Sequence, residues 1–438
     1  MVSDQYGYVH VLWSEVGPDG VPSIQYSRFD GEIWSLPVDV LVSSPDATII
    51  FLAPFVDRLG ILHLMWSEAN VGPVFYSRAS AYNAGTAKAW SPRVRVDASA
   101  FWGRLVVDST GVLHFLYSDF YGEIPGVYYI RSENQGFTWS SPVWLDPDIP
   151  EGVAPTVVYF DIDADDGLHA LWYYLDTVSV NGTWIRYSYS MDGGKTWSLP
   201  FTIDRADESA DELRLPYPEF KVFGTQVHAL WAGDSQVHRE HRYSLDGGQT
   251  WSPTTRILGD LTGQALGGGL DVDSLGRLHY VTQMRYPIGI YHTYWDQNTW
   301  SIPGLAYFIA GSSDESFGDR IHAHNVRLAI RAGNQLVVTF TSSPTDPQMI
   351  LYTIHRSLED TPASDILPTP TAIPLPTSSP TPQIQVSESS PNVGLIGDKN
   401  PPPPEAYKPA LGVMWGFIPA AIVLAIVLVY WLLRRRSA

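Results

Sequence analysis

An eight-residue pattern that recurs along the chain constrains its fold more than any other feature. It reads SMDGGKTW at 190–197 and SLDGGQTW at 244–251, and a third copy at 132–139 has Asn in place of Asp. Degenerate copies end at Trp34 and Trp300, so the closing Trp returns roughly every 50 residues, a period typical of propellers and solenoids. The fold is therefore expected to be built from one repeated supersecondary unit.

The pattern itself predicts a tight turn that supports the neighbouring strands. An Asp side chain accepts hydrogen bonds from backbone N–H groups just after it, and Gly supplies the positive φ angles that such a turn needs. A Trp then buries a large flat surface. The residues interpreted in this way are Ser132, Asn134, Gly136, Trp139, Ser190, Asp192, Gly194, Thr196, Trp197, Ser244, Asp246, Gly248, Thr250 and Trp251. Because an active site normally occurs once, a device that repeats is expected to be structural.

A second pattern with the same period predicts β-strands. The chain reads GILHLMW at 60–66 and GVLHFLY at 111–117, with the alternation of a strand and an Asp–Gly turn before it. Together with an extended entry strand before that turn, an aromatic strand and a short strand after the Trp, each unit holds four strands, as a propeller blade does. The His that recurs in this pattern is interpreted as scaffolding: His10, His63, His114, His169, His228 and His279.

The S-x-D-x-G-x-T-W pattern resembles the Asp-box of the sialidase (BNR-repeat) superfamily. The resemblance covers residues 1–358 and implies an all-β, sialidase-like β-propeller of four-stranded blades. Seven units are present; the first lacks a recognisable first strand, and the last lacks the turn pattern and a closing strand. Sialidases have six blades, so two arrangements stay open, a seven-bladed ring or six blades with an incomplete unit.

The C-terminal part has a different composition. Residues 359–410 are rich in Pro, Thr and Ser and predict an extended extracellular linker. Residues 411–433 form an apolar stretch long enough for one transmembrane helix, and 434–438 carry three arginines. The positive-inside rule places this basic tail in the cytoplasm and the propeller outside the cell. The alternative is a tail-anchored cytoplasmic protein.

Two further features bear on the N-terminus and on ligands. No export signal follows Met1, and with the missing first strand this predicts a true N-terminus upstream. The net charge of −19 excludes nucleic acid as a partner, which requires basic patches. The chain has no Cys and therefore no cysteine-ligated metal, and we expect no cofactor.

The resemblance also implies where catalysis would occur. Sialidases bind the substrate carboxylate with three arginines, use a Tyr activated by a Glu as nucleophile, and use an Asp as acid and base. The F/Y-R-I-P motif that provides the first Arg is not in this sequence. The arginines on or near predicted first strands are Arg104, Arg214, Arg320 and Arg327. The alternative for these residues is ordinary salt bridging at the surface or between blades.

The non-repeating loops provide the other candidates for a site. Two long acidic connectors carry Asp207, Glu208, Asp211, Asp314 and Glu315. A rim formed by them would repel an anionic sugar and suit a neutral glycan, a cation or, with paired carboxylates, a glycosidase; the alternative is two solvated loops.

Aromatic and histidine side chains complete the candidate set. Trp102 and Tyr121 are placed to stack on sugars, although aromatic residues are more often part of the core. His322 and His324 share one face of a strand, as a metal pair would, with a packed pair as the alternative.

Three functions remain open from the sequence. The first is a membrane-anchored propeller at the cell surface that recognises a glycan or protein ligand. The second is a membrane-anchored exo-sialidase or other glycoside hydrolase. The third is a cell-envelope scaffold without a small ligand. Fold alone does not decide between them.

Overall fold

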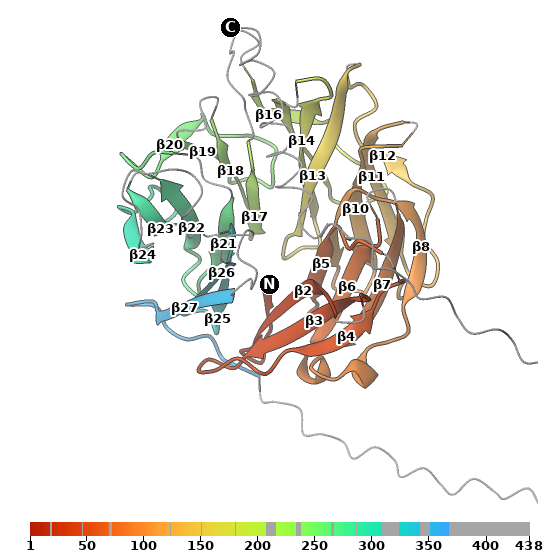
Figure 1. Ribbon diagram of the computed structural model, residues 1–438. Coiled ribbons are helices and arrows are strands. Elements are labelled where there is room, and N and C mark those ends of the chain that lie inside the picture. Colours follow the sequence, from red (N-terminus) through yellow and green to blue (C-terminus); the bar gives the residue numbers. More distant parts are fainter. Residues whose placement is uncertain are drawn as a thin grey trace, which may run out of the picture.

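The computed structural model is a ring of seven antiparallel sheets arranged as blades around a central axis (Figure 1). The chain enters each blade at its innermost strand and moves outward strand by strand. The structure describes residues 1–17, 20–45, 47–69, 72–122, 124–149, 151–179, 181–206, 216–233, 238–263, 267–285, 287–307, 324–341 and 351–367.

The first three blades occupy the N-terminal third of the chain. Their strands are β1 (Val2–Ser3), β2 (Val9–Val16), β3 (Pro22–Phe29) and β4 (Val38–Val42); β5 (Leu52–Val56), β6 (Ile61–Ser67), β7 (Pro73–Ser80) and β8 (Val94–Ser99); and β9 (Trp102–Val107), β10 (Leu113–Asp119), β11 (Gly126–Ser132) and β12 (Val143–Trp144). The described helices are two short 3₁₀ turns, η1 (Ala81–Asn83) and η2 (Ala87–Ala89).

The remaining four blades follow in the same order. Their strands are β13 (Val153–Ile162), β14 (Leu168–Asp176), β15 (Gly182–Ser190) and β16 (Phe201–Arg205); β17 (Glu219–Phe223), β18 (Gln226–Ala232), β19 (Arg239–Ser244) and β20 (Thr255–Ile257); β21 (Gly268–Val272), β22 (Leu278–Arg285), β23 (Ile288–Trp295) and β24 (Gly304–Tyr307); and β25 (His324–Arg331), β26 (Gln335–Thr341) and β27 (Leu351–Ser357).

The expected all-β propeller is confirmed, and the number of blades is seven. Six sheets have four strands, and the last has three within the described residues. The expectation that blade 1 lacks its first strand is wrong, because β1 pairs Val2 with His10. At two residues, β1 is too short to show any periodicity in the sequence. No helix in the described part is both long and apolar enough to cross a membrane, and the stretch 411–433 lies outside that part.

The second strand of each blade forms the centre of the core. Trp66, Trp172 and Trp231, at equivalent places in β6, β14 and β18, have no exposed surface. These strands are buried on both faces because neighbouring blades cover each sheet. Burial of such a ring contributes about 2–3 kcal/mol relative to exposure.

The recurring His joins two parts of its own blade. In blade 2, Asp57 Oδ1 accepts the backbone N–H groups of Leu59 and Ile61 at 2.9 and 2.8 Å and so closes the turn between β5 and β6. Its Oδ2 accepts from His63 Nε2 at 3.1 Å, and His63 Nδ1 lies 2.8 Å from the Tyr76 hydroxyl. The same Asp–His–Tyr relay occurs in blades 1, 3 and 4. These histidines are structural.

Blades 5 and 6 have His where the other relays have Tyr. His228 Nδ1 lies 3.0 Å from His241 Nε2, and His279 Nδ1 lies 2.8 Å from His292 Nε2. Burial lowers the pKa of His228 and of His292 to about 3. Both pairs are therefore neutral, since the acceptor nitrogen of each bond must carry no proton.

The relay Tyr of one blade packs against the S-x-D-x-G-x-T-W turn of the next. Tyr129 in β11 lies beneath Gly194, which has φ +76°, and a side chain at Gly194 would overlap the Tyr129 hydroxyl. Trp197 contacts the same ring edge-on at 5.1 Å between centroids. Within the turn, Asp192 Oδ1 accepts the N–H of Thr196 at 2.9 Å. The repeated pattern thus holds adjacent blades together.

The ring closes between blades 7 and 1 through side chains and a C-terminal segment. Arg331, at the end of β25, donates from Nε to Gly7 O at 2.5 Å and from one terminal nitrogen to Asp30 O at 2.6 Å. Residues 358–367, here called the C-terminal strap, then cross three blades. The strap bonds to blade 6 through Ser274, to blade 7 through Ala332 and Asn334, and to blade 1 through Gln5.

Candidate functional site

The innermost strands of four blades bring charged side chains to the central channel. Arg104 lies on β9, Tyr159 on β13, Glu219 on β17 and Arg327 on β25. Tyr159 feels the charges of the other three, although they come from blades 3, 5 and 7. The four residues lie on innermost strands around the axis and within electrostatic reach of Tyr159, and they are called the channel cluster below.

Arg104 is a cation without an ion-pair partner among the described residues. Its guanidinium donates to the adjacent carbonyl of Gly103 at 3.2 Å and lies 5.4 Å from the ring of Trp102 and 5.8 Å from that of Tyr159. Burial, with a smaller contribution from Arg327, lowers the pKa of Arg104 to about 10. The group therefore stays charged at neutral pH.

Arg327 is the second such cation. One of its terminal nitrogens donates to the neighbouring carbonyl of Val326 at 2.9 Å, and no ion pair is formed with any described carboxylate. The side chain reaches solvent in the channel, yet the surrounding protein lowers its pKa, an effect that Tyr159 and Glu219 oppose. Arg239, unlike Arg104 and Arg327, does form an ion pair: it is 1% exposed, and its terminal nitrogen lies 3.3 Å from Glu219 Oε1.

The protein environment raises the pKa of both Tyr159 and Glu219. Burial raises the pKa of Tyr159, and the nearby carboxylate of Glu219 raises it further. Burial also raises the pKa of Glu219, against the opposing charge of Arg239. A tyrosine in this environment is a hydrogen-bond donor and not a phenolate at neutral pH.

At the lower end of the channel, where the first strand of each blade ends in a turn, carboxylates link neighbouring blades. Lys221 Nζ lies 3.7 Å from Asp161 and 3.8 Å from Asp271, and Asp161 is the main cause of the raised pKa of Lys221. Both carboxylates also accept backbone N–H groups of the following blade, Val222 at 3.0 Å and Ile330 at 2.6 Å. This layer is structural.

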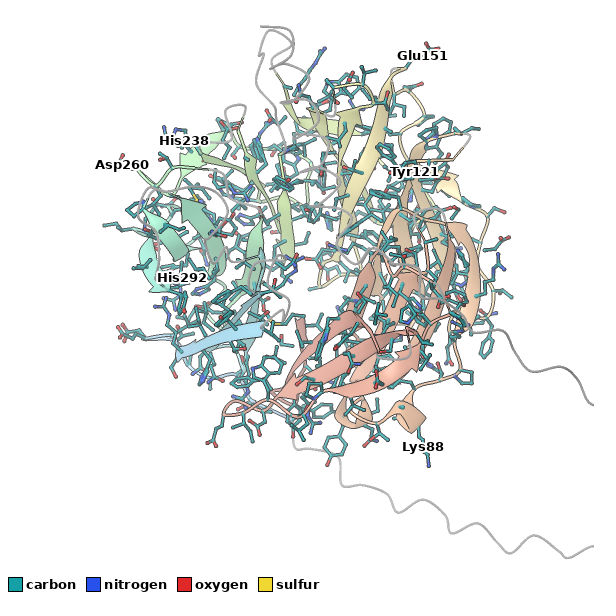
Figure 2. The ribbon with its side chains drawn as sticks, in the orientation of Figure 1. Lys88, Tyr121, Glu151, His238, Asp260 and His292 are labelled. Atoms are coloured by element: carbon teal, nitrogen blue, oxygen red, sulfur yellow. The ribbon has the colours of Figure 1, made fainter. Side chains whose placement is uncertain are left out.

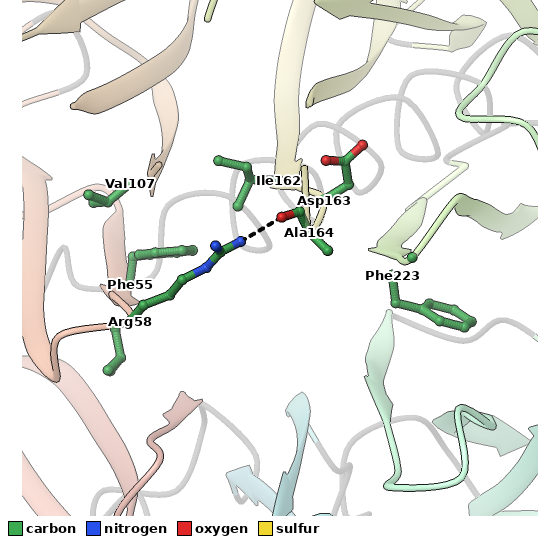
Figure 3. A pocket seen from close by; sticks show the side chains of 9 residues that line it. Phe55, Arg58, Val107, Ile162, Asp163, Ala164 and Phe223 are labelled. Atoms are coloured by element: carbon green, nitrogen blue, oxygen red, sulfur yellow. Dashed lines mark hydrogen bonds between the residues drawn. The ribbon is translucent and has the colours of Figure 1, made fainter. Parts of the chain in front are cut away.

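A cavity of about 260 Å³ opens below that layer (Figure 3). It is lined by the ends of β5, β9, β13 and β17, including Phe55 and Phe223. Arg58 crosses it from blade 2 and donates to Ala164 O in blade 4 at 2.9 Å. This bond links blades 2 and 4 across the lower mouth of the channel.

The structure brings together two of the four arginines singled out in the sequence. Arg104 and Arg327 meet in the channel, and Trp102 supports Arg104. Tyr121 lies on the loop between β10 and β11 and is 49% exposed (Figure 2). His324 begins β25. The other candidates lie outside the described residues: Asp207, Glu208, Asp211, Arg214, Asp314, Glu315, Arg320 and His322.

Three channel residues were not identified from the sequence. Tyr159, Glu219 and Lys221 lie on first strands that were recognised only as strands. The sequence pattern that could have identified them is strand alternation. Polar residues two apart, as in EFKVF at 219–223, lie on the same face of a strand. Within the described residues, no group of three or more His, Asp or Glu side chains is arranged to hold a metal ion.

The fold resembles that of a polysaccharide lyase of known structure. An ulvan lyase bound to a GlcA–Rha3S saccharide superposes with a TM-score of 0.51 at 13% identity, over 81% of this chain and 93% of that one. A Hadza microbial sialidase gives 0.44 at 14% identity, over 74% and 71%, and a sialidase from Streptococcus pneumoniae gives 0.42 at 11%, over 81% and 67%.

The chain is a seven-bladed propeller that shares its fold with the ulvan lyase. At these identities the likeness concerns the fold and not the residues of a site. No family model and no curated protein sequence matches the chain.

Proposed function

We propose that the propeller recognises a carboxylated glycan in its central channel, with Arg104 and Arg327 binding the carboxylate. The observation that supports this is that two guanidinium groups on innermost strands, both within electrostatic reach of Tyr159, have no carboxylate partner among the described residues. The planar guanidinium matches a carboxylate in bidentate geometry, and such charge-assisted bonds are stronger than neutral ones. An ulvan lyase of similar fold was solved with a GlcA-containing saccharide, which agrees with this ligand class.

The charges along the channel favour one direction of approach. Arg239 and Glu219 neutralise each other, so Arg104 and Arg327 leave the cluster with two positive charges. In the lower layer, one Lys lies between two Asp, which leaves one negative charge. An anionic ligand is therefore attracted to the cluster and repelled by the layer beneath it.

Loss of either arginine is expected to weaken binding strongly. A charge-assisted hydrogen bond contributes about 1.5–3 kcal/mol, so Arg104→Gln and Arg327→Gln should each raise Kd at least ~10-fold, and the double variant ~100-fold. The measurement is titration calorimetry of the full chain in detergent micelles with glucuronate- and sialate-terminated oligosaccharides.

The controls for this experiment are a lower-mouth variant and a neutral ligand. Arg58→Gln removes an arginine whose side chain is 60% exposed at the lower mouth and should leave Kd unchanged. Carboxyl-reduced versions of the same sugars should bind no better to wild type than to the double variant. Equal affinity of wild type and double variant for the carboxylated sugars would refute the assignment of the ligand to the channel.

Hydrolysis is the second candidate function, because Tyr159 lies beside both Glu219 and Arg104. The raised pKa of Tyr159 favours binding over nucleophilic attack. Fluorogenic sialosides and glucuronides, incubated with the full chain, distinguish the two. Turnover that disappears in Tyr159→Phe would establish a glycosidase, whereas carboxylate binding without turnover supports a recognition module.

We propose further that the propeller is displayed on the cell surface by residues 359–438. The composition of the linker, the apolar stretch 411–433 and the arginines that follow support this arrangement. Protease added to intact cells is expected to release a folded propeller by cutting within 368–410, and an antibody to the basic tail should then detect a fragment retained in the membrane. A propeller that is cleaved only after the cells are permeabilised would place it in the cytoplasm instead.

A further inference from the structure

A groove between blades 2 and 3 has the features of a separate ligand site. It encloses about 470 Å³, within the usual range for small-ligand pockets. One wall is the outermost strand of blade 2, β8, and the other is the face of blade 3 formed by β10 and β11. It does not share a residue with the channel cluster, which uses the innermost strand of blade 3.

The blade-3 wall is a row of aromatic rings. Tyr117, Tyr128 and Trp144 are directly paired across β10, β11 and β12. Tyr117 and Tyr128 stack with centroids 5.6 Å apart, and Tyr128 and Trp144 with centroids 6.1 Å apart. Two of these rings line the groove, and aromatic faces bind the C–H faces of pyranose rings.

The blade-2 wall is a row of polar side chains. Arg95 and Asp97 are two residues apart along β8 and share one face of the strand, and an irregularity in the pairing of β8 with β7 brings Ser99 to the groove as well. Asp119, at the end of β10, adds a second carboxylate; burial raises its pKa, although it accepts the N–H of Gly122 at 2.8 Å. Two carboxylates and one guanidinium leave a net negative charge, opposite to that of the channel cluster.

Two hydroxyl groups at the groove have no hydrogen-bond partner among the described residues. The Tyr117 ring is 5% exposed, and its hydroxyl makes no hydrogen bond to a described residue but reaches solvent at the groove. Ser99 Oγ is also buried without a partner. An unmade hydrogen bond of a buried hydroxyl costs about 1–3 kcal/mol.

We propose that this groove is a second carbohydrate site and that it binds a neutral saccharide of one or two rings. The half-buried ring of Tyr128 stacks on the sugar. The carboxylates of Asp97 and Asp119 accept hydrogen bonds from the sugar hydroxyls, and the Tyr117 hydroxyl provides one further hydrogen bond. A carboxylated sugar is disfavoured here because the net charge is negative. The two sites therefore select opposite ligand charges on one propeller.

The test is a glycan array followed by titration, using the full chain in detergent micelles. The array carries neutral oligosaccharides of glucose, galactose, mannose and xylose together with glucuronate- and sialate-terminated ones. Asp97→Asn removes an exposed charge that makes no ion pair within the described residues, so it should leave the fold unchanged. It is expected to raise Kd for the best neutral sugar at least 10-fold, and Tyr117→Phe about 5-fold.

The two sites are distinguished by reciprocal controls. The Arg104→Gln, Arg327→Gln double variant should bind neutral sugars as wild type does, and the groove variants should bind carboxylated sugars as wild type does. Thermal midpoints within experimental error of wild type exclude unfolding as the cause. The proposal fails if wild type binds no neutral sugar, or if neutral binding survives both Asp97→Asn and Tyr117→Phe. The channel proposal is judged separately by the carboxylated sugars.

Discussion

Gly194→Ala is expected to lower the free energy of unfolding by about 3 kcal/mol or more, whereas Gly193→Ala should lower it by about 1 kcal/mol. Both glycines have positive φ, +76° and +70°, so each substitution carries the strain of that conformation, about 1–2 kcal/mol. A Cβ at Gly193 meets nothing within 4 Å, but at Gly194 it would overlap the Tyr129 hydroxyl. The difference between the variants measures the contact between blades 3 and 4.

Urea denaturation followed by tryptophan fluorescence provides the measurement. Gly248→Ala and Gly247→Ala are an independent pair, since Gly248 packs on Tyr187 while Gly247 has only an ordinary contact with Met191 at 3.4 Å. Equal destabilisation by the two members of each pair would show that backbone strain accounts for the whole effect. The turn would then not be a contact that holds blades together.

Acidification from pH 8 to pH 5 is expected to lower the free energy of unfolding by about 4 kcal/mol through protonation of His228 and His292 in the unfolded state. The pKa of His228 and of His292 is lowered by burial to about 3, against about 6.5 in an unfolded chain. A folded pKa below the unfolded value means that the unfolded state binds the proton first. The stability is complete above pH 6.5 and is lost as the pH falls toward 3, by about 2 kcal/mol per histidine at pH 5.

His292→Tyr tests the origin of this acid sensitivity. It gives blade 6 the Asp–His–Tyr relay of the first four blades and removes one of the two groups, so the loss between pH 8 and pH 5 should shrink by about 2 kcal/mol. The turn aspartates do not interfere. The pKa of Asp57, for example, is lowered because hydrogen bonds from His63 and the backbone outweigh the effect of burial, so its contribution is lost only below about pH 4. An unchanged pH dependence in His292→Tyr would contradict the explanation.

The sequence was sufficient to predict the blades because their determinants are local. Each S-x-D-x-G-x-T-W turn is closed by bonds within a few residues, such as that from Thr196 N–H to Asp192. The number of blades was harder, since β1 is only two residues long and shows no period of its own. It forms a local hairpin with β2, whose turn is closed by Asp4 Oδ1 accepting the backbone N–H groups of Tyr6 and Tyr8.

The channel cluster could be predicted only in part, for a geometric reason. Arg104 and Arg327 lie 223 positions apart in the numbering, and they meet only because seven blades complete the ring. Strand alternation gives the side of a strand on which Glu219 lies but not the residues across the axis from it. The groove between blades 2 and 3 could not be predicted from the sequence for the same reason. Whether the polar side chains of β8 face the aromatic row of β10 and β11 depends on the spacing of adjacent sheets.

The C-terminal strap also determines how the ring responds to mechanical force. Tension on the residues after Leu367 reaches the propeller first at the bond from Leu367 N–H to Gln5 O in blade 1, and then at the bond from Ser364 N–H to Ala332 O in blade 7. The bond between Ser274 and Pro362 carries the load on to blade 6. A pull therefore has to break bonds to three blades one after another before it acts on β27, so the strap protects the junction between the first and last blades from shear.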